Sequence, residues 1–311
     1  MFNNVPRLKF TFNIGKSLEK TNIKKNFSEI TLCDFDKDNL ITQSKIYKIL
    51  LKLYKTDKQK ISNAFNNGFC TPCALYNSFP FIFEENLQNV AKLIYDNLEK
   101  DKFANVKYIT DKFSKLLHVS ENIKDSYKLF ESNIQQNKSV VITYQYSNIN
   151  PKYIKKQHTI SLFGYDENSI YYYENSDQNI LFYSLACYLR DYLANFDNLN
   201  ETIEESIKKQ FLDNNSNEQE LLDIAAKILG YKKLENGLSM LNRYFLTDEK
   251  IFFDANQIVT CIDDNSYNNY INSIKVERMD SLNLSLVDSG KKYENQFNFT
   301  SLTNRLKNLS F

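Results

Sequence analysis

The sequence predicts an α+β fold in which a helical subdomain packs on an antiparallel sheet. Apolar residues recur at helical spacing between 41 and 98, on both sides of a cysteine motif. Runs of β-branched and aromatic residues then indicate strands at 139–146, 158–165 and 169–175. Turn-forming residues at 166–168 separate the last two runs, so these two strands form a predicted hairpin.

The N-terminal half of the chain carries most of the helical signal. The expected elements are strands in 7–14 and 29–34, helices at about 41–56, from the cysteine motif onward and at about 87–98, and a helix from an N-cap at Ser120 to about 136. Pro72 fits a first helical turn, where the N–H that proline lacks has no partner. We therefore expect Cys70 at or just before an N-cap and Cys73 inside the first turn.

The C-terminal half mixes helix and strand signals. The expected elements are a helix at 181–196, two or three helices over 201–246 with one ending near Gly230, and scattered strands in 250–311. We expect one domain over 1–200 and a C-terminal helical and mixed extension over 201–311, packed on the same body.

Composition and charge narrow the classes of function. The 311 residues, 42% of them hydrophobic, suffice for a large core. A net charge of +1 gives no field that favours nucleic acid or an anionic membrane. The N-terminus lacks the apolar core of a signal peptide and no run reaches the roughly 18 apolar residues of a membrane span, so we expect a soluble protein that is cytoplasmic where it is made. Five cysteines, an odd number, argue against a disulfide framework.

A cysteine and a histidine are the candidate reactive pair. Cys70 and Cys73 mark a helix N-terminus, where the helix dipole lowers the pKa of a thiol. A general base must lie near that thiol in space, and the chain has only two histidines, His118 and His158. His118 falls at a predicted helix–loop boundary, which favours a structural or solvent-facing role, whereas His158 opens a strand that would hold its ring rigidly.

The predicted hairpin supplies a third group beside His158. With a two-residue loop at 166–167, Asn175 lies opposite His158 and is the expected orienting residue. A loop of odd length would favour Glu174 instead. Asn67, just upstream of the cysteines, is a candidate amide donor to an oxyanion, together with the backbone N–H of the nucleophile.

Three other interpretations of the cysteines are open. The segment Phe69–Cys73 also resembles a redox dithiol, but such a motif follows a hydrophobic strand, and the residues before this one are polar. A zinc site would need ligand pairs at finger-like spacing, which the dispersed histidines do not provide, so we expect no metal and no cofactor. The cysteines could also be small packing residues of the core.

The chain resembles papain-like cysteine peptidases in the order and spacing of three motifs. These are Gly68-Phe69-Cys70-Thr71-Pro72-Cys73, then His158-Thr159-Ile160 leading to Gly164-Tyr165, then Asn175-Ser176. The resemblance implies a papain-like fold with a catalytic domain over 1–200. The chain departs from the pattern in lacking the aromatic residue after the second cysteine, the upstream glutamine, whose place Asn67 takes, and the tryptophan after Asn-Ser, where Asp177 stands.

A second resemblance covers residues 60–245. The segments Cys70–Leu75 and His158–Asp166 resemble the N-terminal domain family of butirosin biosynthesis protein H and related double-glycine-type peptidases. In this alignment the nucleophile is Cys70, and an acid after the second strand brings Glu174 into competition with Asn175.

These resemblances imply acyl transfer through a thioester on a cysteine. The butirosin-type resemblance implies an acyltransferase of natural-product biosynthesis that moves an acyl group from an acyl carrier protein to an amine. The peptidase resemblance implies hydrolysis of a peptide or protein substrate, as in a bacterial effector exported without a signal peptide. A non-catalytic or redox protein on the same fold is the third possibility, and oligomeric state is open.

Overall fold

The computed structural model has a mixed α+β architecture. It describes residues 30–66, 68–121, 126–146, 156–167, 169–177, 179–182, 185–186, 218–242 and 255–274. The helices of this part are α1 (Gln43–Leu53), α2 (Lys58–Phe65), α3 (Cys70–Ser78), α4 (Leu87–Asp96), α5 (Val106–Asp111), α6 (Ser126–Gln135), α9 (Glu218–Leu229) and α11 (Asp264–Ser273). The strands are β1 (Thr31–Leu32), β2 (Leu117–Ser120), β3 (Val140–Tyr146), β4 (Lys156–Tyr165), β5 (Ser169–Tyr173), β6 (Lys232–Lys233), β7 (Ser239–Asn242) and β8 (Ala255–Cys261).

One antiparallel sheet runs through the described part of the molecule. Its strand order is β2-β8-β3-β4-β5-β7-β6, and β1 pairs with the end of β4. Every described pair of neighbouring strands is antiparallel. The predicted antiparallel sheet is therefore confirmed.

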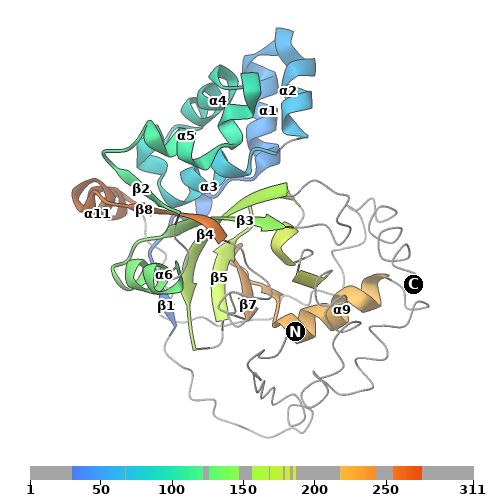
Figure 1. The fold of residues 1–311 in the computed structure, drawn as a ribbon, viewed down its shortest axis with the longest axis vertical. Helices are drawn as coiled ribbons and strands as arrows, with labels where there is room; N and C mark the ends of the chain where they lie inside the picture. Colours follow the sequence, from blue (N-terminus) through green and yellow to red (C-terminus); the bar gives the residue numbers. More distant parts are fainter. Residues whose placement is uncertain are drawn as a thin grey trace, which may run out of the picture.

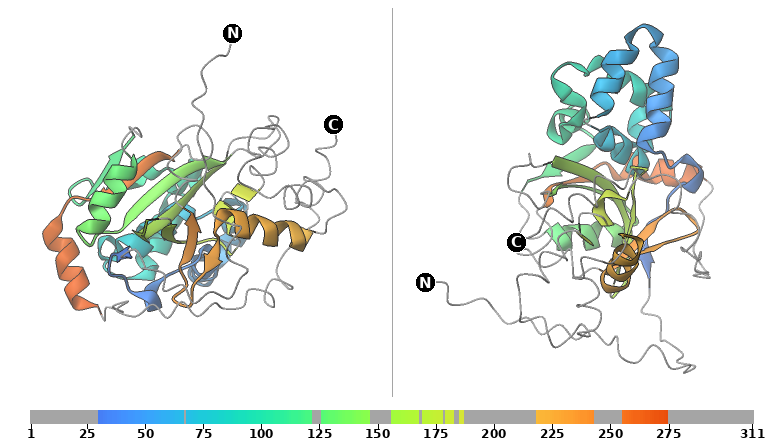
Figure 2. Two further views of the ribbon diagram at one scale, coloured as in Figure 1. Left: turned by 90° about the horizontal axis from the view of Figure 1, so that it is seen from below. Right: turned by 90° about the vertical axis from the view of Figure 1, so that its right-hand side faces the viewer.

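Helices cover both faces of this sheet (Figures 1 and 2). Helices α1 to α5 form a subdomain on one face, where Val141 and Val259 join their core. Helices α6 and α9 cover the other face, where Ile142 and Ile258 point. Neighbouring residues of one strand enter opposite cores because side chains alternate across a sheet.

Several predicted elements are confirmed with shifted ends. Helices α1, α3 and α4 and strands β3, β4 and β5 lie where the sequence patterns predict them, and α9 ends at Leu229 before Gly230, whose φ is +64°. Glycine adopts this left-handed conformation without steric cost. Residues 180–182 and 185–186 are helical, as expected for 181–196. The predicted strand at 7–14 and the helices expected over 201–217 lie outside the described residues.

Two element predictions are wrong. Ser120 is the last residue of strand β2 rather than a helix N-cap, and the helix that follows is α6. Residues 232–242, expected as helix, form the hairpin of β6 and β7 that extends the sheet beyond β5. Strand β7 pairs with β5, far earlier in the chain, so sheet contacts override the local helical pattern.

The C-terminal part of the chain contributes an interior strand to the sheet. Strand β8 lies between β2 and β3, with Val259 paired to Val141 and Val119. The predicted division at residue 200 stays a prediction, but β7 and β8 belong to the same sheet as the strands that precede that residue.

A β-bulge in strand β4 changes the register of the predicted hairpin. Tyr165 pairs with Ile170, so the turn lies one residue later than the predicted loop at 166–167. Between Leu162 and Gly164 the pairing shifts by one residue. At Gly164 itself a Cβ would lie 2.2 Å from Leu32 Cδ2, so the close passage of β1 requires glycine here.

None of the described helices is both long and apolar enough to cross a membrane.

Candidate active site

The N-terminus of helix α3 presents Cys70 to strand β4. Cys70 is the first residue of the helix and Phe69 is its N-cap. The chain enters the helix through Gly68, whose φ is +84°. The Phe69 N–H donates to Gln43 Oε1 at 2.6 Å, which fixes the peptide just before Cys70. The predicted helix start is therefore confirmed, with Cys70 one position inside it.

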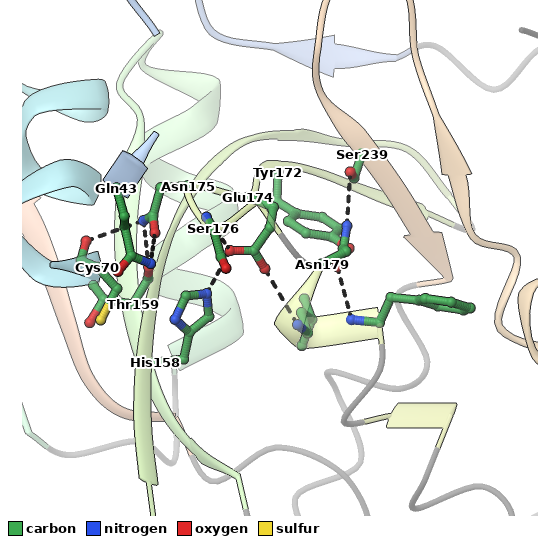
Figure 3. A network of polar contacts seen from close by, with 12 residues as sticks. Gln43, Cys70, His158, Thr159, Tyr172, Glu174, Asn175, Ser176, Asn179 and Ser239 are labelled. Atoms are coloured by element: carbon green, nitrogen blue, oxygen red, sulfur yellow. Dashed lines mark hydrogen bonds and ion pairs between the residues drawn. The ribbon is translucent and has the colours of Figure 1, made fainter. Parts of the chain in front are cut away.

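His158, at the beginning of β4, faces Cys70 (Figure 3). Burial by itself raises the pKa of the Cys70 thiol, but a hydrogen bond to His158, the charge of its ring and smaller contributions from Thr159 together outweigh burial and lower that pKa below its ordinary value of 9.0. Cys70 is only 7% exposed and His158 only 2%, so little water screens this interaction.

Glu174 holds the other side of the His158 ring. His158 Nε2 lies 2.6 Å from Glu174 Oε1, which leaves Nδ1 toward Cys70. The same carboxylate accepts the backbone N–H of Ser176 at 3.0 Å and that of Leu181 at 3.4 Å. Burial lowers the pKa of His158, but the Glu174 charge and the hydrogen bonds to Cys70 and Glu174 raise it to about 10.

The two opposite pKa shifts favour a charge-separated pair. A thiol with a lowered pKa beside an imidazole with a raised pKa holds its proton on the ring, as thiolate and imidazolium. Glu174 balances the imidazolium charge. The three side chains therefore make a nucleophile, a proton carrier and an anchor for that carrier, which is the arrangement that acyl transfer through a cysteine requires.

The prediction that Asn175 orients His158 is wrong in geometry. The bulge in β4 places even-numbered residues after β5 on the His158 side, so Glu174, the alternative, reaches the ring. Asn175 points to the opposite face of the sheet. There its Nδ2 donates to the backbone oxygens of Cys70 at 3.1 Å and Thr159 at 2.8 Å (Figure 3). Asn175 thus ties the start of the nucleophile's helix to the strand of the base.

Cys73, the alternative nucleophile, lies away from this polar contact. It is fully buried in the apolar core of the helical subdomain. Burial, together with the nearby Cys70 charge, raises the pKa of Cys73 well above its ordinary value. A thiol of this kind stays protonated and unreactive.

The remaining sequence candidates fall elsewhere. His118 lies exposed on strand β2, at one edge of the described strand order, and strands β8 and β3 separate it from β4. Asn67 lies outside the described residues. Cys33, Cys70, Cys73 and Cys261 are free thiols. Within the described ranges, no group of three or more His, Cys, Asp and Glu side chains is placed to hold a metal ion.

Two residues at this site carried no sequence signal that would single them out. Gln43, at the start of α1, accepts from the Phe69 N–H and donates to Asn175 Oδ1 at 3.0 Å. Thr159 follows the predicted base directly, and its backbone N–H and hydroxyl help to lower the pKa of Cys70. A buried glutamine 27 positions before the nucleophile could be found only from the fold.

Comparison of the chain with protein-family models found no match. Neither a curated protein nor a solved structure matches it. A function for this chain is therefore inferred from the geometry of the Cys70 site and from the motifs that build it.

Proposed function

We propose that this protein is a papain-like cysteine enzyme that transfers an acyl group through a thioester on Cys70. The observation that carries the proposal is the buried chain of contacts from Cys70 through His158 to Glu174. Structural ion pairs also shift pKa values, but the nucleophile of this pair lies at a helix N-terminus, where a developing oxyanion finds backbone N–H donors.

His158 carries the proton both when the acyl-enzyme forms and when it breaks down. The Cys70 thiolate attacks the carbonyl carbon of the donor, and the backbone N–H groups of the first turn of α3 stabilise the oxyanion. The bond to the leaving group breaks, and His158 gives its proton to that group. An acceptor then attacks the thioester and loses a proton to His158, and the Cys70 thiolate leaves with the electron pair of the broken C–S bond.

The identity of the third residue supports a transferase as the first candidate. An acid after the second strand and a nucleophile at Cys70 fit the butirosin-type resemblance, whereas the papain-like peptidase pattern places Asn175 on the histidine. Because Glu174 occupies that position, we propose an acyl carrier protein as donor and an amine as acceptor. Hydrolysis of a peptide or protein substrate by the same residues is the competing outcome of the test.

The burial of the site also supports transfer. Cys70, His158 and Glu174 are each at most 9% exposed. A thioester formed at a site with so little water contact reacts with a bound acceptor before bulk water reaches it.

Intact-mass spectrometry with a small acyl thioester as donor tests the proposal. We expect the mass of one acyl group to appear on the wild type and on Cys73→Ala, and not on Cys70→Ala or His158→Ala. Adding a primary amine should then release the group as an amide. Absence of an adduct from wild type and Cys73→Ala would contradict acyl transfer, and release only to water together with cleavage of peptide substrates would favour the peptidase.

A further inference from the structure

A chain of buried threonine hydroxyls ends at the nucleophile. Thr143 and Thr159 pair across strands β3 and β4, and their Oγ1 atoms are 3.2 Å apart. Thr159 Oγ1 also lies 3.1 Å from Oγ1 of Thr71, which follows Cys70 in helix α3. All three threonines are 1% exposed. Hydroxyls so deeply buried cost free energy unless they hydrogen-bond, so the contacts are part of the fold.

Asn175 fixes the distance between these threonine hydroxyls and Cys70. Its Nδ2 bridges the backbone oxygens of Cys70 and Thr159, so the two residues cannot separate without breaking a buried contact. Figure 3 shows Thr159 beside Cys70. The Cys70 side chain thus lies near both His158 and Thr159, which are consecutive residues of β4.

We propose that the Thr159 hydroxyl donates a hydrogen bond to the Cys70 thiolate and that Thr143 orients it for this purpose. This inference rests on the proposed function and adds a residue to its machinery. The hydroxyl and backbone N–H of Thr159 are among the groups that lower the pKa of Cys70, which agrees with a donor role.

Each threonine hydroxyl has one proton to donate, and this determines the direction of the hydrogen bonds among them. Thr71 donates its proton to Ala104 O at 3.2 Å, so its oxygen accepts from Thr159 while Cys70 is neutral. Once Cys70 is a thiolate, the charged sulfur is the stronger acceptor and Thr159 turns its proton to it. Thr143 then donates to the Thr159 oxygen, and the chain polarises toward the sulfur.

The hydroxyl acts at two points of the proposed reaction. It stabilises the resting thiolate, and it stabilises the same thiolate when the C–S bond of the acyl-enzyme breaks and the electron pair returns to sulfur. It donates a hydrogen bond in both states and transfers no proton, so the proton balance at His158 is unchanged.

Titration of Cys70 by its alkylation tests the inference. The rate of carbamidomethylation by iodoacetamide follows the thiolate fraction, and its pH midpoint gives the thiol pKa. We expect Thr159→Val, which keeps the branched shape, to raise that midpoint by about one pH unit, the shift for loss of a hydrogen bond to a charged group. Thr159→Ser, which keeps the hydroxyl, should have the wild-type midpoint. If Thr159→Val does not fold, Thr159→Ala takes its place in the comparison.

Ser161 provides a matched control on the same strand. Its buried hydroxyl donates to Ala74 O at 3.0 Å, across the same interface between β4 and α3, two residues further along. Ser161→Ala should leave the Cys70 midpoint unchanged. An equal shift in Ser161→Ala and Thr159→Val would overturn the inference, because a general loosening of the interface would then explain both.

The two proposals fail in different ways. A wild-type Cys70 with the midpoint of an ordinary thiol overturns the proposed function and this inference with it. A low wild-type midpoint that Thr159→Val leaves in place overturns the donor role of Thr159 alone.

Discussion

Replacing Glu174 by glutamine should remove the ion pair with His158 while a side chain of nearly the same size still fills the position. Glutamine has nearly the same size and can still accept from His158 Nε2, so the contacts at 2.6 Å to His158 and 3.0 Å to the Ser176 N–H can both persist. What disappears is the negative charge, which is the largest influence that raises the pKa of His158. The imidazolium then loses stability relative to the neutral ring.

The magnitude follows from the burial of the pair. A hydrogen bond to a charged partner contributes about 1.5–3 kcal/mol, and 1.36 kcal/mol corresponds to one pKa unit, so we expect the pKa of His158 to fall by about one to two units. The histidine charge lowers the pKa of Cys70, so the reactivity of the thiolate changes where the ring loses its proton. The upper step in the pH dependence of Cys70 alkylation, which marks that proton loss, should therefore move down by the same one to two units.

The assay is the pH dependence of Cys70 alkylation, with Glu167→Gln as the control. Glu167 is an exposed residue in the turn of the same hairpin, so this variant changes the net charge equally without touching His158. We expect the Glu167 variant to match the wild type. If Glu174→Gln also matches it, Glu174 does not support the charge on His158 and the reasoning is refuted.

Three further predictions concern the framework of the site. Asn175→Ala should lower the free energy of unfolding by about 3 kcal/mol, since it leaves several buried polar groups unpaired, and urea unfolding that shows a loss below about 1 kcal/mol would contradict this. Gly164→Ala should lower the Tm, because the added Cβ would lie 2.2 Å from Leu32 Cδ2, and an unchanged Tm would show that β1 moves freely. The free energy of unfolding should stay constant between about pH 6.5 and 9, because Cys70 and His158 together hold one proton in the folded state and one in the unfolded state. It should fall below that range, where acid protonates the folded thiolate, and above it as pH rises through the His158 pKa of about 10. The Cys70→Ala variant should instead lose stability from about pH 6.5 upward.

Local patterns in the sequence were sufficient for much of the fold. The apolar spacing of α1 and α4 and the β-branched run of β3 are properties of short segments, and the structure has these elements where they are predicted. Helix α3 could be placed because proline favours a first helical turn. The position of β8 between β2 and β3 depends on pairing between residues more than 100 positions apart, which no local pattern contains.

The site was predictable in its residue types but not in its final geometry. Cys70 and His158 followed from the chemistry of thiolates and from the strand that holds the histidine. The choice between Asn175 and Glu174 depended on one extra residue in β4, because a one-residue change of register exchanges the two faces of a strand. Gln43 joins the site only through the packing of α1 against the rest of the subdomain.

The ultraviolet absorbance of the thiolate tests the central claim most directly. The difference between the wild type and Cys70→Ala isolates the absorbance of this one sulfur while leaving Cys73 in place. We predict a thiolate band for Cys70 at neutral pH that disappears on acidification, and its loss at neutral pH in His158→Ala. A difference spectrum without a thiolate band until the pH nears the ordinary thiol value of 9.0 would contradict the ion pair, and with it the proposed acyl transfer.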